Sequence, residues 1–263
     1  MTSTTPRRLY VSDIHLTPGD SQSDQQRLTA FCHLLRSASQ GAVDEIYLLG
    51  DLFEMWIGDD DDSALANAIA ELLQTISQRT SVSFLAGNRD FLLGSQFADR
   101  TGLTLIQDPH ALGMETLLSH GDSLCTDDLA YQQMRTLLRS TEWQEDILGK
   151  SLAERRAFGA ALRNQSKAAN ANKASNIMDV NDDAVSQMIG AHGAKLFIHG
   201  HTHRPAKHSL ACGAQRVVLG AWERCAWWAI QEGQNISLRC ASMGWLATSS
   251  YQKIVASQAF AKP

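Results

Sequence analysis

Cysteine is scarce in this sequence, which has only 5 cysteines among 263 residues. They are scattered, odd in number and form no C-x-x-C pair, which argues against a thiolate metal site and a disulfide framework. We expect reduced thiols in a cytosolic protein. No apolar run approaches the roughly 18 residues that a membrane-spanning helix needs, and the first residues show no signal-peptide pattern. The sequence therefore predicts a cytoplasmic protein without a membrane span.

Positive charge is also limited. The chain carries 23 Lys and Arg against 28 Asp and Glu, a formal net charge of −5, which argues against a general nucleic-acid binder. No internal repeat or low-complexity tract is present. With 44% hydrophobic residues, the chain can form one large α/β domain or a domain with an insertion.

Five apolar, β-prone segments end abruptly in polar clusters. Their sequences are RLYVSDIH, EIYLLGDLF, VSFLAGNRD, METLLSHGD and AKLFIHGHTH. A helix-like stretch, residues 63–78, separates two of the early segments, and this alternation predicts an α/β fold with a largely parallel sheet. In such folds, binding sites form in the loops beyond the carboxyl ends of the strands. We therefore expect the five polar clusters to meet at one edge.

Residues 123–185 have a different, mostly helical pattern. Between residues 131 and 173 there are eight Lys or Arg and four Asp or Glu, a local charge of +4. Ser151 and Glu154 form a capping box that predicts the start of a helix. One broad stripe of that helix, at 3.6-residue periodicity, carries Arg156, Arg163, Ser166, Asn170 and Lys173. We predict a helical substrate-binding cap at 123–185, inserted in a core of residues 1–122 and 186–245 and followed by a tail at 246–263. An ordinary solvated helix face is the alternative.

The polar clusters contain a set of metal-binding side chains. Its members are Asp13, His15, Asp51, Asn88, His120, His199 and His201. This mixture of carboxylate oxygen, amide oxygen and imidazole nitrogen suits Mn²⁺, Fe²⁺ or Zn²⁺. Seven ligands suit two ions rather than one, and the Asp51 carboxylate is the candidate to bridge them. Two ions roughly 3.5–4 Å apart form a clamp for in-line displacement at phosphorus.

Three of the nine histidines lie within five residues, at His199, His201 and His203. Alternate residues of an extended chain point to the same side, so the three imidazoles are expected to converge. Converging imidazoles repel one another when protonated, unless a metal ion or a carboxylate takes them up. We predict that the first two bind metal and that His203 braces the loop.

In this order, the motifs D-x-H, GD, GN, H and G-H-x-H resemble those of the calcineurin-like metallophosphoesterases. The segments SDIHL, GDLFEMWIGDD, LAGNRDFLLG, SHGDSLCTDD, NQSKAANANK, IMDVN and IHGHTHRPA are most similar to the bacterial UDP-2,3-diacylglucosamine hydrolase family. They span most of residues 9–222. The resemblance implies an α/β fold, an αββα sandwich with a helical cap. It also implies a hydrolase of lipid A biosynthesis, in which water attacks the α-phosphorus of UDP-2,3-diacylglucosamine and gives UMP and 2,3-diacylglucosamine 1-phosphate (lipid X).

The resemblance further implies two Mn²⁺ ions per chain and a role for each motif residue. One ion is held by Asp13, His15, Asp51 and His201, and the other by Asp51, Asn88, His120 and His199. The implied catalytic residues are Asn88, Arg89 and His199. The implied substrate contacts are Asn88, Arg89, Asp128, Ser166, Asn170, Lys173 and His199, to which the helix stripe adds Arg163. The implied partners are a lipid-linked nucleotide and an anionic membrane surface, at the cytoplasmic face of the inner membrane. We expect neither nucleic acid nor an obligate protein partner.

Arg89 follows Asn88 where many superfamily members that cleave alkyl esters have a histidine as general acid. Arginine stays protonated and is a poor proton donor. A leaving alkoxide is about as basic as hydroxide and needs that proton. A leaving phosphate monoester, with a second pKa of about 6, can depart unprotonated. Since Arg89 can instead pair with phosphate oxygens, it favours cleavage of a phosphoanhydride.

Several alternatives stay open at this point. A phosphodiesterase or nuclease with the same metal core is disfavoured by the net acidity, and a non-catalytic scaffold is disfavoured because no ligand is missing. The acidic run at residues 59–62 is expected to be a solvated loop that caps the following helix, rather than a third metal site. Phe91, Leu92 and Leu93 either line an acyl-chain groove or pack in the core.

Overall fold

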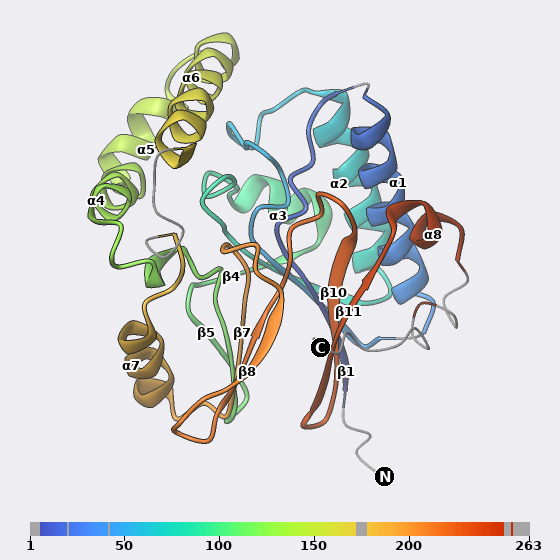
Figure 1. Ribbon diagram of the computed structural model, residues 1–263. Helices are drawn as coiled ribbons and strands as arrows, with labels where there is room; N and C mark the ends of the chain where they lie inside the picture. Colours follow the sequence, from blue (N-terminus) through green and yellow to red (C-terminus); the bar gives the residue numbers. More distant parts are fainter. Residues whose placement is uncertain (1–5, 20, 42, 172–177, 250–253, 255–263) are drawn as a thin grey trace.

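Two β-sheets lie face to face at the centre of the protein (Figure 1). The computed structural model describes residues 6–19, 21–41, 43–171, 178–249 and 254. The first sheet has the strand order β11-β10-β1-β2-β3-β4, with β1 to β4 parallel and β10 and β11 antiparallel. Its strands are β1 (Arg7–Val11), β2 (Glu45–Leu49), β3 (Ser81–Leu85), β4 (Thr104–Ile106), β10 (Ala226–Glu232) and β11 (Asn235–Ala241).

The second sheet has the order β5-β6-β7-β9-β8, in which β6, β7 and β9 are parallel. Its strands are β5 (His110–Leu112), β6 (Thr116–Leu118), β7 (Leu196–His199), β8 (Ala206–Ser209) and β9 (Gln215–Val218). All five segments expected to be strands are therefore strands. They belong to two sheets, and within each sheet they pair in parallel as expected.

Helices cover the outer faces of both sheets (Figure 1). α1 (Gln22–Ala38), α2 (Ala64–Ser77) and α8 (Met243–Thr248) lie beside the first sheet, and α3 (Ser95–Thr101) packs against α2. α7 (Asp182–His192) lies against the second sheet. The order helix, sheet, sheet, helix is the αββα sandwich that the sequence motifs imply.

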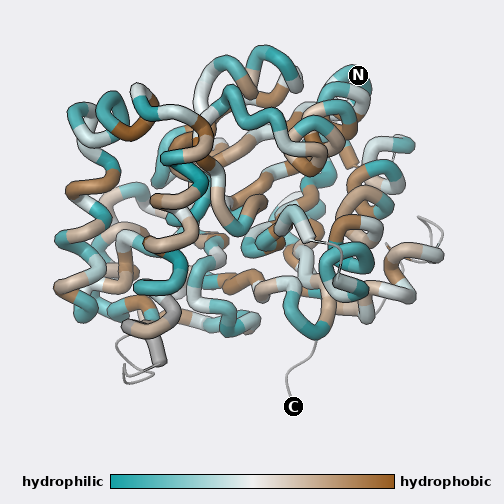
Figure 2. Tube along the Cα trace, turned by 90° about the horizontal axis from the view of Figure 1, so that it is seen from above, coloured by the Kyte–Doolittle hydropathy of each residue, from teal (hydrophilic) through white to brown (hydrophobic). Residues whose placement is uncertain are grey.

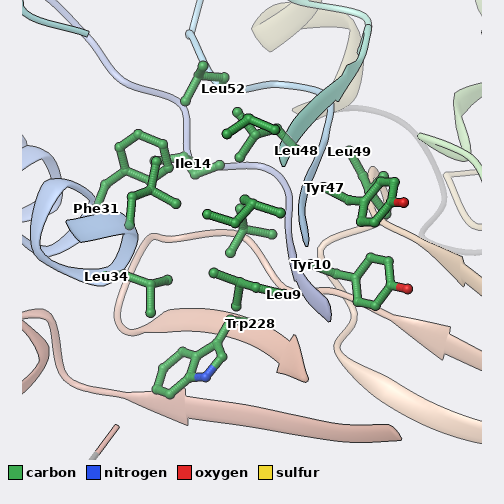
Figure 3. Close-up of a cluster of buried hydrophobic side chains, with 14 of the residues drawn as sticks. Leu9, Tyr10, Ile14, Phe31, Leu34, Tyr47, Leu48, Leu49, Leu52 and Trp228 are labelled. Atoms are coloured by element: carbon green, nitrogen blue, oxygen red, sulfur yellow. The ribbon is translucent and has the colours of Figure 1, made fainter. Parts of the chain in front are cut away.

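The core forms because the central strands and the helices that cover them have apolar faces. On α1, Phe31 and Leu34 are buried, and Figure 3 shows them gathered with Leu9 of β1. Alternate residues of a strand point to opposite sides, so Tyr10 lies on the other face, where its ring stacks on Tyr47 with centroids 5.3 Å apart. In Figure 2, hydrophobic and hydrophilic residues alternate along the helices, as expected for helices with one buried side. Each buried large side chain stabilises the fold by roughly 1.5–3 kcal/mol.

Three further helices stand apart from the sheets (Figure 1): α4 (Leu129–Leu138), α5 (Thr141–Leu148) and α6 (Leu152–Ala171). The capping box of α6 is present, since Ser151 Oγ accepts from the Glu154 amide at 3.3 Å and the Glu154 carboxylate accepts from the Ser151 amide at 2.9 Å. α7 begins at Asp182, inside the segment 123–185, and already packs on the second sheet through Val185. Lys173 and most of the tail lie outside the described residues. No helix of the described part is long and apolar enough to cross a membrane.

Candidate metal centre

The side chains predicted as metal ligands come together where the two sheets meet. Each follows, or ends, one of five strands, and three of these strands belong to the first sheet and two to the second. Asp13 and His15 follow β1, Asp51 follows β2, Asn88 follows β3, His120 follows β6, and His199 and His201 lie at the end of β7. The parallel strands of the two sheets thus deliver their polar ends to one place.

Asp51 is at the centre of this cluster. Its Oδ1 lies 3.6 Å from Nε2 of His120, whereas its Oδ2 lies 3.9 Å from Nε2 of His15. The Asn88 Oδ1 atom is 3.0 Å from His120 Nε2 and 2.8 Å from His201 Nδ1. On the other side, Asp13 Oδ1 is 4.0 Å from His15 Nε2. The two oxygens of one carboxylate therefore face two different sets of ligands, which is the arrangement that a bridging residue needs.

The backbone around the cluster is strained. Among the described residues, the non-glycine residues with positive φ are all aspartates and histidines of this region, with φ between 53° and 64°. They are Asp13, His15, Asp51, His201 and His203. Backbone in sparsely populated conformations costs of order 1–3 kcal/mol per residue and is concentrated at functional sites. Strain limited to the candidate ligands indicates that the loops are shaped for the site and not for stability.

Two glycines allow the strained loops to approach one another. A Cβ atom at Gly87 would lie 2.1 Å from Oδ1 of Asp51, and a Cβ atom at Gly200 would lie 2.2 Å from Oδ2 of Asp13. Both distances are far shorter than a van der Waals contact. Gly200, between the first two clustered histidines, is therefore required for close packing beside a candidate ligand.

Two of the imidazoles use Nδ1 in a backbone hydrogen bond, so that Nε2 is the ring nitrogen left to bind a metal ion. His120 Nδ1 donates to the Leu49 carbonyl at 2.9 Å, and His199 Nδ1 donates to the Gly200 carbonyl at 3.0 Å, which leaves both Nε2 atoms available. His199 Nε2 is buried and has no hydrogen-bond partner among the described residues. Burial, and then Arg216, lower the pKa of His199 to about 4, so the ring is neutral at pH 7.

The carboxylates make the cluster attractive to cations. Burial lowers the pKa of His120, but Asp51 and Asp13 outweigh it and raise this pKa to about 9. Asp13, Asp51 and His120 offer ligand atoms that all lie within 4.8 Å of one another, and so do Asp13, His15 and His203. These two groups of oxygen and nitrogen donors share Asp13. Together with the unpaired, buried Nε2 of His199, they fit two divalent ions.

His203 is closer to the cluster than the sequence suggested. Its Nε2 atom lies 3.2 Å from Nε2 of His15 and 3.4 Å from Oδ1 of Asp13. The alternation argument does not apply here, since β7 ends at His199 and the next histidines lie in left-handed backbone. His203 is therefore placed to bind a metal ion together with Asp13 and His15. Its expected role in bracing the loop stays a prediction.

Asp90 is a residue that sequence reasoning missed. It is fully buried, and its carboxylate accepts from the amides of Leu52 at 2.7 Å and Gly87 at 2.8 Å, with longer contacts to the amides of Asp51 at 3.2 Å and Phe53 at 3.4 Å. It thereby ties the loop after β2 to the loop after β3. Its place two residues after Asn88 in GNRD was the available signal.

Arg89 lies where four cavities meet. One cavity, of about 260 Å³, is lined by four of the candidate ligands and also by Asp128, Tyr131 and Ser166. These ligands are His15, Asp51, Asn88 and His201. A polar cavity lies beside His15 and Arg163. Two narrow apolar cavities open between the core and the cap, lined by Met55, Trp56, Phe91, Leu92, Trp143, Phe158, Leu162, Met134 and Leu138. Phe91 and Leu92 therefore line a groove, whereas Leu93 packs in the core.

The other predicted substrate contacts are placed less uniformly. Asp128 lines the ligand cavity and also caps α4, accepting from the Tyr131 amide at 3.2 Å. Ser166 lines the same cavity. Asn170 belongs to α6, but its side chain, like the whole of Lys173, lies outside the described residues.

The cationic stripe of α6 is partly neutralised by the core. Arg163 pairs with Glu54, whose Oε2 lies 3.3 Å from His15 Nδ1, and Arg156 pairs with the acidic run. Carboxylates of the core therefore hold both arginines of the stripe. A substrate contact by Arg163 stays a prediction.

The acidic run, residues 59–62, is not simply solvated. Asp60 pairs with Arg155, a largely buried residue of α6 that also donates to the Ile57 carbonyl at 2.8 Å. Asp59 accepts from the amides of Gly94 at 2.9 Å and Phe97 at 3.0 Å. Ser63, and not an aspartate, caps α2. The run connects the cap to the core, and its carboxylates have partners without a third metal ion.

Carboxylates and imidazoles gathered on strained loops at the ends of parallel strands are typical of metal-dependent phosphoesterases. Comparison with known sequences agrees with this class. The family model for calcineurin-like phosphoesterases matches residues 6–205.

Individual curated proteins share a large part of their sequence with this chain. The chain is 43% identical to UDP-2,3-diacylglucosamine hydrolase of Cellvibrio japonicus over 238 residues, which cover 88% of this chain and 97% of the relative. It is 46% identical to the enzyme of the same name from Aeromonas salmonicida, over 81% of this chain and 85% of the relative. The chain therefore belongs to the calcineurin-like phosphoesterase family, in the group of the UDP-2,3-diacylglucosamine hydrolases.

Proposed function

We propose that this protein hydrolyses the pyrophosphate bond of UDP-2,3-diacylglucosamine and gives UMP and 2,3-diacylglucosamine 1-phosphate. The observation that carries the proposal is the position of Arg89, at the junction of the metal-ligand cavity and the two apolar cavities. A substrate with a diphosphate between a polar nucleoside and two acyl chains matches this arrangement. The names of the curated relatives support the same substrate.

The chemistry at the site is positioning and charge stabilisation. Two divalent ions, which we propose to be Mn²⁺, would supply Lewis acidity and activate water when bound. The proposed ligands are those inferred from the motifs, with Asp51 between the two ions and His203 as a further candidate. Asn88 and His199 orient the diphosphate beside them. The Arg89 guanidinium stabilises negative charge on the phosphate oxygens, and the lipid phosphate leaves without a general acid.

Release of UMP from UDP-2,3-diacylglucosamine tests this function directly. Chelation is expected to abolish UMP release, and added Mn²⁺ is expected to restore it. In ¹⁸O-labelled water the label is expected on UMP, because attack is at the α-phosphorus. Equal activity on a generic phosphodiester would instead favour the nuclease alternative, and label on the lipid phosphate would contradict the proposed attack.

The predicted division into core, cap and tail belongs to the same proposal. We assign substrate binding to the segment 123–185, and Lys173→Ala is expected to raise KM while the metal content stays unchanged. A matched control is Lys195→Ala, because Lys195 is exposed, lies outside the segment 123–185 and pairs with Glu115.

We also propose that the cap side docks on an anionic membrane at the cytoplasmic face of the inner membrane. Leu129, Leu137, Leu148 and Phe158 of the three cap helices are exposed, in a segment with excess positive charge. Binding to vesicles that contain anionic phospholipid is expected to weaken as salt rises, because the attraction is screened. Salt-independent binding would mean that the exposed apolar side chains dominate.

A further inference from the structure

A second polar cavity lies on the outer face of the second sheet and borders the ligand cavity at Arg204. It has a volume of about 750 Å³ and opens between the first turn of α7 and the hairpin of β8 and β9. Its charged and polar lining includes Arg204, His208, Arg216, Asp179 and Asp182. The reaction proposed above assigns no direct contact with the substrate to these residues, although Arg216 helps to lower the pKa of His199.

Within the part of the chain that the structure describes, no ion pair joins Arg216 to a carboxylate. It lies on β9 between Phe197 of β7 and His208 of β8, and is only 8% exposed. Its Nε and Nη1 atoms are buried and have no hydrogen-bond partner within the described residues. Because a guanidinium stays protonated, burial without partners is strongly unfavourable. Such a group in the wall of a cavity indicates a ligand that supplies acceptors.

The carboxylates of the cavity do not provide these acceptors. Asp179 is taken by an ion pair with Arg204. Asp182 lies in the first turn of α7, and in the described part of the chain no ion pair joins it to Arg216. Residues 172–177, which the structure does not describe, contain no Asp or Glu that could pair with Arg216.

We propose that this cavity binds the phosphate group of a small molecule, with Arg216 as its principal contact. An arginine fork matches the oxygens of a phosphate and can donate two parallel hydrogen bonds. Arg204 lines both this cavity and the ligand cavity, so the second site borders the first. The ligand is either free phosphate or the phosphate of a nucleotide. The proposal does not depend on the proposed hydrolase activity.

The parent protein loaded with metal provides the first test. Crystals soaked in selenate, which mimics a tetrahedral oxyanion, are expected to show an anomalous peak within hydrogen-bond distance of Arg216. Absence of this peak, with Arg216 paired to Asp182, would overturn the proposal. No variant is needed, so a folding defect cannot obscure the result.

Calorimetry with inorganic phosphate, and separately with UMP, provides the solution test. The metal-loaded parent is expected to show one more binding event than Arg216→Gln, whereas Lys195→Gln, which also removes one positive charge, keeps the parent stoichiometry. Asp182→Asn is expected to strengthen the event, because it removes a competing negative charge. Binding of phosphate alone identifies a free-anion site, and binding of UMP alone identifies a nucleotide site. The same stoichiometry in parent and Arg216→Gln for both probes contradicts the site.

Discussion

Asp90→Ala is expected to disorganise the metal centre without removing any ligand. The Asp90 carboxylate is completely buried and joins the loops that carry Asp51 and Asn88. Burial and the neighbouring Asp51 raise its pKa to about 6. The charged carboxylate is therefore less favourable here than it would be in water. Such a carboxylate persists because the loop amides need an acceptor.

The expected loss follows from the amides left without partners. Two of the four amide contacts are short, to Leu52 at 2.7 Å and Gly87 at 2.8 Å. An unsatisfied buried donor costs about 1–3 kcal/mol, so losing these two bonds is expected to lower the free energy of unfolding by roughly 2–6 kcal/mol. Asp90→Asn keeps one acceptor oxygen and is expected to lose less.

Urea unfolding of metal-free protein measures this loss without a contribution from bound ions. The matched control is Asp99→Ala, which removes an exposed carboxylate of α3 and is expected to stay within about 0.5 kcal/mol of the parent. A loss below about 1 kcal/mol for Asp90→Ala would show that the loops hold their shape without this acceptor and would refute the reasoning.

Three further outcomes follow from the site and the cap. Arg155→Ala should raise KM for the diacyl substrate several-fold in steady-state assays, because the cap loses a buried tether, whereas Lys150→Ala, which breaks an exposed pair, should not. Arg89→Ala should reduce kcat by about 10²–10³-fold at unchanged metal content, and replacement by histidine should not restore it; a fully active histidine variant would remove the case for charge stabilisation. Burial raises the pKa of Asp122, but His120, Arg139 and Arg135 outweigh it and hold this pKa below 3.8. Its contribution to stability is present above pH 3.8 and is lost as the pH falls below it, so acid unfolding should be shallower in Asp122→Asn than in the parent.

The candidate ligands could be predicted because each lies at the end of an apolar strand or a few residues after it. A short buried strand and the polar turn that follows it are local features, as in the passage from Leu49 to Asp51. Pairing between distant strands is not local. The pattern of β6 and β7 resembles that of β1 and β2, and nothing in it says that the two pairs belong to different sheets.

The direction of charged side chains was the least predictable property. Helical periodicity placed Arg163 and Ser166 on one stripe of α6. It could not show that Glu54 of the core pairs with Arg163. Likewise, alternation predicts side-chain directions only in extended backbone, and His203 has a φ of 55°. Such positions depend on tertiary contacts.

Metal content per chain tests the central claim most directly. Elemental analysis of the purified parent, dialysed after loading with Mn²⁺, is expected to give two ions per chain. Asp51→Ala is expected to lose both, because the two carboxylate oxygens face the two halves of the cluster, whereas Asp99→Ala is expected to retain two. A parent with fewer than two ions, or an Asp51→Ala variant as fully loaded as the parent, would contradict the two-ion site.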